Sequence, residues 1–131
     1  MHYKMFTDAG SRGNPGHAAI GYVIYNQDSK IVAEGSKYIG IATNNVAEYT
    51  ALLLGCIKLK SLGCTKVNLF LDSELVVKQM LGLYKIKKPE LLKIQQKILE
   101  ELKGIEWTIH HVYRDKNKHA DMLVNRTLDN R

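Results

Sequence analysis

Four acidic residues stand at positions where strand-like segments of this chain end or helix-like segments begin. They are Asp8, Glu48, Asp72 and Asp121. Carboxylates that are brought close together repel one another, and a divalent cation relieves this repulsion. If the fold gathers these side chains, they form a metal site made of hard oxygen ligands. On a basic chain, a metal-loaded acid cluster indicates a nuclease.

The composition is that of one ordinary globular domain, and we expect residues 1–131 to form a single domain. Of the 131 residues 45% are hydrophobic, and no repeat, low-complexity segment or Pro/Gly/Ser-rich linker divides the chain. No segment has the features of a signal peptide, and no stretch approaches the length of a membrane span. We therefore expect a soluble, cytoplasmic, monomeric protein without a membrane partner.

The balance of charge is basic, with a formal net charge of +6 at pH 7 and an isoelectric point near 9.3. This excess fits an anionic partner such as nucleic acid, although many basic proteins bind nothing anionic. The two cysteines, Cys56 and Cys64, lie inside and just after a helical pattern, which favours buried thiols over a disulfide. No further ligands at the spacing of a zinc site accompany them.

Hydrophobic periodicity and turn residues predict nine elements. Strands are expected at residues 2–8, 18–26, 31–38, 66–71 and 106–112. Helices are expected at residues 45–62, 73–81, 89–103 and 118–128. The glycine-rich residues 10–16 are expected to form a loop. The order β-β-β-α-β-α-α-β-α indicates an α/β fold with a mixed sheet.

Topology rules bring the four acids to one edge of this sheet. Two hairpins make the first three strands antiparallel, and right-handed crossovers return the last two strands parallel to the first. Asp8 and Asp72 then lie at the same ends of two neighbouring strands. Glu48 and Asp121 lie in the first turns of helices that start at that edge. Ligands of open α/β sheets bind at the carboxyl ends of the strands, where these acids are expected to meet.

Each acid also has a structural explanation, which the sequence leaves open. Glu48 could complete a capping box with Asn45, and Asp72 could cap the helix that follows it. Asp121 could interact with the dipole of the last helix, and Asp8 could stabilise the glycine-rich loop. Four unrelated caps, however, have no reason to converge on one end of a sheet.

At these positions the chain resembles type 1 ribonucleases H over nearly its whole length. Four motifs in the family's order carry the resemblance: Asp8-Ala-Gly-Ser-Arg-Gly-Asn-Pro-Gly16, Thr43-Asn-Asn-x-x-Glu48, Asp72-Ser73 and Asn117-x-x-Ala-Asp121. Among subgroups the chain is most similar to the short, archaeal-like bacterial members. The resemblance implies a ribonuclease H-like α/β fold, with a five-stranded mixed sheet in the order 3-2-1-4-5 flanked by helices.

The resemblance also implies an activity. Asp8, Glu48, Asp72 and Asp121 would be the catalytic, metal-binding acids, with two Mg²⁺ or Mn²⁺ ions as cofactors. The implied reaction is endonucleolytic hydrolysis of the RNA strand of an RNA–DNA hybrid, which leaves 3′-hydroxyl and 5′-phosphate ends. Whether double-stranded RNA is a second partner is left open.

Substrate binding is assigned to two of the motifs by the same resemblance. In the family, the first loop and the asparagines of the second motif read the 2′-hydroxyl groups of RNA from the minor groove. Here these positions are Gly10, Ser11, Asn14, Asn44 and Asn45. Thr43 matches a residue that grips a phosphate of the DNA strand. The alternative for the first five is loop and helix-cap chemistry, and for Thr43 it is a position that flanks the N-terminus of a helix.

The chain departs from longer family members in two places. The basic handle between the middle helices is reduced to residues 83–88, whose three lysines either contact phosphate or form a solvated turn. The loop before the fourth acid is compressed to residues 114–118. We interpret His119 as a helix-surface residue, and His110 and His111 as structural residues of the last strand.

Two further functions follow as alternatives. The missing handle fits a nucleic-acid-binding module that has the same fold but little or no catalytic turnover, whereas the intact set of four acids argues against it. A proofreading-type exonuclease of the same superfamily usually begins with Asp-x-Glu. Asp8-Ala9-Gly10 lacks that glutamate, which disfavours this class.

Overall fold

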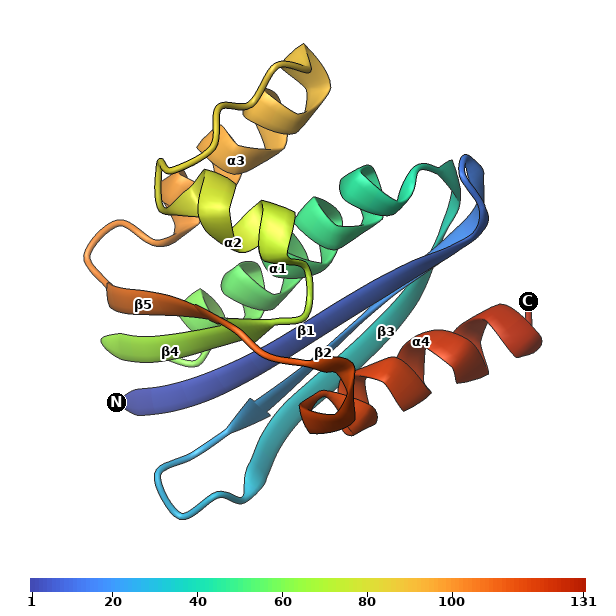
Figure 1. The fold of residues 1–131 in the computed structure, drawn as a ribbon. Helices are drawn as coiled ribbons and strands as arrows, with labels where there is room; N and C mark the ends of the chain where they lie inside the picture. Colours follow the sequence, from blue (N-terminus) through green and yellow to red (C-terminus); the bar gives the residue numbers. More distant parts are fainter.

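The computed structural model describes residues 1–131, and its elements follow the predicted order (Figure 1). The strands are β1 (His2–Gly13), β2 (Gly16–Tyr25), β3 (Ile31–Ala42), β4 (Lys66–Leu71) and β5 (Glu106–His111). The helices are α1 (Asn44–Ser61), α2 (Glu74–Met80), α3 (Pro89–Glu101) and α4 (Lys118–Asp129), with a short 3-10 helix, η1 (Arg114–Lys116), before α4. None of the helices combines the length and the apolar character that crossing a membrane requires.

The strands form one sheet in the order β3-β2-β1-β4-β5, which confirms the expected strand order. β2 pairs antiparallel with both β1 and β3, whereas β4 pairs parallel with both β1 and β5. Figure 1 shows α1, α2 and α3 on one face of this sheet and α4 on the other, where α4 packs on β1, β2 and β3. The sheet is therefore the middle layer of three.

The main core lies between the sheet and α1. Strand alternation turns Met5, Leu69 and Ile109 of three neighbouring strands toward that side, where they meet α1 residues such as Leu52. Burying each large apolar side chain of this kind contributes about 1.5–3 kcal/mol. Cys56 and Cys64 are free and buried, which confirms the interpretation of both as buried thiols.

The first hairpin differs from the prediction. β1 continues through Gly13 and β2 begins at Gly16, so the expected loop at residues 10–16 is wrong in extent. The cause is tertiary: the segment pairs with β2, and the Ser11 hydroxyl donates to the Ala42 carbonyl at 2.8 Å, which outweighs the loop preference of its glycines. Gly13 closes the turn with a φ of 111°, a conformation that favours glycine.

Two other glycines allow helices to lie close to the middle of the sheet. In α1, a Cβ atom at Gly55 would collide with the Met5 side chain on β1. In β2, a Cβ atom at Gly21 would lie 2.9 Å from the Ala120 carbonyl oxygen of α4. Gly21 is the pairing partner of Asp8, so α4 approaches the sheet beside this acid, whereas α1 approaches the opposite face at Met5.

Candidate metal centre

Three of the predicted acids converge in the structure. One carboxylate oxygen from each of Asp8, Glu48 and Asp72 lies within 4.8 Å of the other two. Asp8 and Glu48 are 3% and 8% exposed, and Asp72 is half-buried. Oxygen ligands lie about 2.0–2.6 Å from Mg²⁺ or Ca²⁺, so one cation can contact all three carboxylates at these separations.

Asp8 and Asp72 meet because of where the pairing of two strands ends. The parallel pairing of β1 with β4 stops at Thr7 and Leu71, and each acid is the next residue along the chain. The expectation that Asp8 stands at the end of its own strand is wrong, since β1 continues to Gly13 paired with β2 alone. Because β4 ends at Leu71, no β4 residue pairs with Asp8, and the Asp8 carboxylate can face the other acids.

The capping explanations for Glu48 and Asp72 are wrong. Thr43 caps α1 through its hydroxyl, which accepts from the Val46 N–H at 3.2 Å, so Glu48 lies beyond the third helical position that a capping box uses. Ser73 caps α2 in the same way, accepting from the Val76 N–H at 3.3 Å. Neither acid is needed to start its helix.

Asp121 approaches the cluster from the opposite face of the sheet. It is half-buried in the first turn of α4, where an interaction with the helix dipole remains available to it. Burial and the charge of Asp72 raise the pKa of Asp8 most, and the nearby Asp121 carboxyl raises it further. The Asn117 Nδ2 group donates to the Thr7 carbonyl at 2.8 Å and ties the start of α4 to β1. Asp121 therefore lies near Asp8 but outside the group of three acids whose oxygens all lie within 4.8 Å of one another.

Burial and repulsion both favour protonated carboxyls in this cluster. Burial raises the pKa of Asp8 to about 8, and the charges of Asp72 and Asp121 contribute to that rise. Burial also raises the pKa of Glu48 well above its usual value, and the charges of Asp8 and Asp72 make smaller contributions to this rise. Without a cation, Asp8 and Glu48 therefore hold their protons to higher pH than ordinary carboxyls do.

The residues present fit a divalent cation. Glu48 Oε2 and Asp72 Oδ2 are buried and have no hydrogen-bond partner in the protein. A buried carboxylate oxygen without a partner is costly unless a ligand completes it. Carboxylate oxygens are hard ligands, which suit Mg²⁺, Mn²⁺ and Ca²⁺ better than soft metals. The unpaired oxygens therefore favour a bound cation over a purely structural role.

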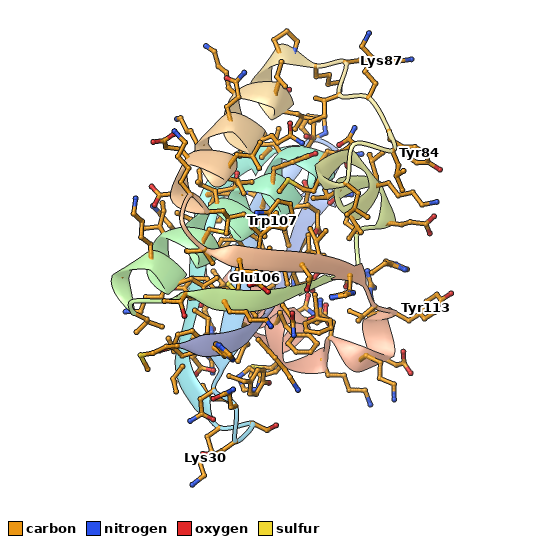
Figure 2. The ribbon with its side chains drawn as sticks, turned by 90° about the vertical axis from the view of Figure 1, so that its left-hand side faces the viewer. Lys30, Tyr84, Lys87, Glu106, Trp107 and Tyr113 are labelled. Carbon is orange, nitrogen blue, oxygen red and sulfur yellow. The ribbon has the colours of Figure 1, made fainter.

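Sequence reasoning missed Arg114, the first residue of η1. Its positive charge acts against the rise in the pKa of Glu48 that burial and the neighbouring acids cause. The chain before it runs beside the site, since the Val112 N–H donates to the Leu71 carbonyl at 2.8 Å, and Figure 2 shows Tyr113 projecting into solvent at the end of β5. The sequence did contain a signal for Arg114. Because β5 runs parallel to β4, the residues that follow β5 lie at the same edge of the sheet as Asp72.

Three predicted substrate-binding residues form a hydrogen-bonded cluster. The Ser11 N–H donates to Asn44 Oδ1 at 3.0 Å, and the Asn44 N–H donates to Asn14 Oδ1 at 3.1 Å. These bonds fix the turn of the first hairpin against the start of α1, where Figure 1 shows the two segments meeting. They use the carbonyl oxygens of both amides and leave the NH₂ groups available to a ligand.

The other three predicted substrate-binding residues lie outside that cluster. Gly10 faces α4, where a Cβ atom would meet Val124 at 3.4 Å, so its position serves packing. The Thr43 hydroxyl caps α1, as its structural alternative proposed. Asn45 lines a separate cavity between α1, α2 and the connection to α3.

That cavity contains the reduced basic segment. Its volume is about 490 Å³, and Tyr84, Lys85, Lys87 and Lys88 line it with Asn45. Figure 2 shows Tyr84 and Lys87 projecting from this end of the molecule. The exposed lysines give the cavity positive charge without forming a separate handle.

Comparisons of sequence assign the chain to a known group. A family model described as reverse transcriptase-like matches residues 6–127. Ribonuclease HI of Halobacterium salinarum is 43% identical over 125 residues, which cover 95% of this chain and 63% of the relative. A bifunctional protein of Mycobacterium tuberculosis is 44% identical over 135 residues, which cover 98% of this chain and 36% of the relative. The chain thus spans only part of the length of these curated relatives.

Solved structures agree with this assignment over their full length. Ribonuclease H1 of Halobacterium salinarum has a TM-score of 0.96 at 41% identity and is covered completely, as is this chain. LC11-RNase H1, solved in complex with an RNA/DNA hybrid, has a TM-score of 0.93 at 40% identity, covering 98% of this chain and 97% of that one. The chain belongs to the type 1 ribonuclease H family.

Proposed function

We propose that the protein is a divalent-metal-dependent endonuclease that hydrolyses the RNA strand of RNA–DNA hybrids, using two Mg²⁺ or Mn²⁺ ions. The observation that carries this proposal is the convergence of Asp8, Glu48 and Asp72 with two buried, unpaired carboxylate oxygens. Its substrate is supported by LC11-RNase H1, a relative of nearly equal length that was solved in complex with an RNA/DNA hybrid.

The four acids are the proposed ligands of the cations. Asp8, Glu48 and Asp72 would hold the cations, and Asp121 completes the ligand set from α4. When bound, divalent cations lower the pKa of water and stabilise the charge that develops on a phosphodiester. The carboxylates alone would repel a phosphodiester, so productive binding of the substrate depends on their neutralisation. The expected products carry 3′-hydroxyl and 5′-phosphate ends.

Arg114 supplies the protein's own positive charge to this edge of the sheet. A guanidinium can donate two hydrogen bonds to a phosphate, and it remains charged at any pH at which the enzyme works. Its charge acts against the rise in the pKa of Glu48, which supports a role beside the acids. We therefore assign it the orientation of the scissile phosphate.

The hydrogen-bonded cluster of Ser11, Asn14 and Asn44 is assigned to the minor groove of the hybrid. Amide NH₂ groups donate well to 2′-hydroxyl groups, which distinguish RNA from DNA. The cavity beside Asn45, with Lys85 and Lys87, is assigned to phosphates of the DNA strand. Binding through these lysines should weaken as salt is raised.

The test is a cleavage assay on a hybrid whose RNA strand carries a fluorophore. Protein freed of metal with EDTA is expected to cut internally only after Mg²⁺ or Mn²⁺ is added, and the 3′ ends should support extension by a polymerase. The control pair is Asp72→Asn, expected to be inactive, and Asp28→Asn, an exposed aspartate in the β2–β3 turn, expected to be fully active.

Two results would contradict the proposal. Cleavage that persists in EDTA would rule out the metal-dependent mechanism. Binding of the hybrid without any cutting at tenfold enzyme excess would instead support a binding module. A double-stranded RNA of the same sequence, assayed in parallel, tests whether the specificity is limited to hybrids.

A further inference from the structure

One part of the sheet is left open by the helices. α4 packs on β1, β2 and β3, and Figure 1 shows no helix on that side of β4 and β5. Parallel strands are usually covered on both faces, so an open face on three parallel strands is unusual. Registered rows of side chains from β1, β4 and β5 lie there: Phe6, Phe70 and His110 in one row, and Lys4, Asn68 and Thr108 in the next.

The first row is a stack of aromatic rings. The rings of Phe6 and Phe70 are 4.7 Å apart and inclined by 15°, and those of Phe70 and His110 are 5.2 Å apart and inclined by 26°. β5 is the edge strand of the sheet, so no further strand covers the second face of the exposed His110 ring. The stack therefore ends in an imidazole that is open on one side.

The second row holds that imidazole in place. The Thr108 hydroxyl donates to Asn68 Oδ1 at 2.7 Å, and His110 Nε2 lies 2.8 Å from the same hydroxyl oxygen. With the hydroxyl proton directed to Asn68, Nε2–H donates to Thr108. A ring that is already fixed loses little conformational freedom when a ligand stacks on it.

A positively charged hollow lies at the other end of the stack. Tyr25 contacts Phe6 edge to face, with ring centroids 5.8 Å apart, and both line a cavity of about 250 Å³. Lys4, Lys116 and Lys118 also line this cavity, and none of these lysines takes part in an ion pair.

No acid lies within ion-pair distance of these lysines, and two acids of the surrounding strands have other partners. Glu106 pairs with Lys66 at 3.4 Å, and Glu34 Oε2 lies 2.6 Å from His119 Nε2. The stacked rings therefore lie beside three lysines that still lack a counter-charge. A ligand that satisfies both features carries flat rings and regularly spaced negative charge.

We propose that this open sheet face, formed by the aromatic stack and the lysine-lined cavity, binds single-stranded nucleic acid. Bases continue the stack beyond His110, and phosphates reach Lys4, Lys116 and Lys118, the combination of stacking and positive charge that single-strand binders use. The inference goes beyond the proposed function, because this binding needs neither the acid cluster nor a cleaved strand.

The experiment measures the fluorescence anisotropy of labelled 15-nucleotide dT and U oligomers in EDTA, where no cation supports cleavage. His110→Ala is expected to weaken binding about tenfold, the effect of losing one stacked base. Lys4→Ala with Lys118→Ala should also weaken binding and reduce its dependence on salt. The charge-matched control is Lys93→Ala with Lys97→Ala on α3, at the opposite face, which should leave binding nearly unchanged.

The proposal is overturned if the wild-type protein binds neither oligomer. It is also overturned if the control pair weakens binding as much as the Lys4 and Lys118 pair, because net charge would then explain the effect. If His110→Ala fails to fold by circular dichroism, Lys4→Glu with Lys118→Glu replaces it, and unchanged affinity in that variant sinks the idea.

The outcome is separable from that of the proposed function. Cleavage of a blunt RNA–DNA hybrid by His110→Ala is expected to stay within twofold of wild type, because the blunt hybrid has no unpaired strand. Loss of cleavage in the wild type with intact oligomer binding would contradict the proposed function alone. Intact cleavage without oligomer binding would contradict the single-strand site alone.

Discussion

Two buried polar groups that are adjacent in α1 belong to clusters built in opposite ways. The Tyr49 hydroxyl donates to Gln79 Oε1 at 2.7 Å, and Gln79 Nε2 donates to the Lys85 carbonyl at 3.3 Å. Gln95 then donates to the Gln79 backbone carbonyl at 3.2 Å. Glu48, one residue earlier, has an unpaired oxygen and faces other acids.

The difference separates a structural role from a functional one. A buried polar network whose members satisfy each other stabilises the fold without help from outside. Buried like charges with unpaired oxygens destabilise the fold until a ligand neutralises them. The hydrogen bonds of Tyr49, Gln79 and Gln95 position α2 against α1, whereas the acid cluster offers oxygens that a cation can bind. Substitutions in the first cluster should therefore change stability, and substitutions in the second should change cleavage.

The largest effect is expected from Asp72→Asn. Cleavage of the hybrid should fall by at least about 1,000-fold, because the amide removes a ligand charge from the metal centre. The melting temperature in EDTA should stay equal or rise, since one repulsive charge is lost. Single-turnover cleavage and thermal unfolding measure the two responses. Retained cleavage would contradict a functional role of the acid cluster, and a large loss of stability would indicate a structural role instead.

The second-largest effect is expected in the pH dependence of stability, which the acid cluster should control and the Tyr49 cluster should not. The pKa of Asp8 rises from 3.8 to about 8, so between these values the folded, metal-free protein keeps a proton that the unfolded chain has lost. The free energy of unfolding should therefore fall as pH rises from about 4 to 8, by roughly 2–5 kcal/mol. Urea unfolding in EDTA measures it. Asp8→Asn should flatten the dependence, and an equally steep curve in that variant would exclude Asp8 as its source.

Variants of Arg114 test whether a positively charged side chain assists cleavage at the acid cluster. Arg114→Ala should reduce the rate of cleavage roughly 10- to 150-fold, because a charged hydrogen bond to phosphate contributes about 1.5–3 kcal/mol. Arg114→Lys should recover part of the rate, since it restores the charge but not the two-pronged donor. Stability should change little, because the residue is exposed. Equal rates for all three proteins would remove Arg114 from the site.

The smallest effect on cleavage is expected from Tyr49→Phe, in the hydrogen-bonded cluster of Tyr49, Gln79 and Gln95. Tyr49→Phe leaves Gln79 Oε1 without its donor and should lower the free energy of unfolding by about 1 kcal/mol. Cleavage at temperatures well below the melting transition should stay within twofold of wild type. Urea unfolding and steady-state cleavage separate the two effects. A large loss of cleavage without a loss of stability would assign Tyr49 to catalysis.

The elements and their order were predictable because their signals are local. The helical period of α1 and the proline at the start of α3 act within a few residues of sequence. The extension of β1 past Asp8 was not predictable, because it depends on pairing with β2 and on the Ser11 contact with β3. Glycines that continue a strand and glycines that form a loop look the same in sequence.

The acid cluster was predictable from topology, whereas its surroundings were not. Parallel pairing of β1 and β4 brings Asp8 and Asp72 together wherever the strand ends fall. The charge of Arg114 at the site and the division of the substrate residues depend on side-chain packing. The roles of Glu48 and the other acids in catalysis remain predictions, which the variants above test.

The missing side chain at Gly21 has a thermodynamic consequence. It lets α4 start beside Asp8, yet α4 is held by two small apolar clusters that include Ala19 and Val23 rather than by the main core. Asp121, the proposed fourth ligand, thus lies on a helix with only small apolar clusters beneath it, and the other three acids lie on the sheet, just after β4 and on α1. A cation that engages both parts lowers the free energy of the docked helix relative to the frayed one. Slower hydrogen exchange in α4 on adding Mn²⁺ would report that coupling.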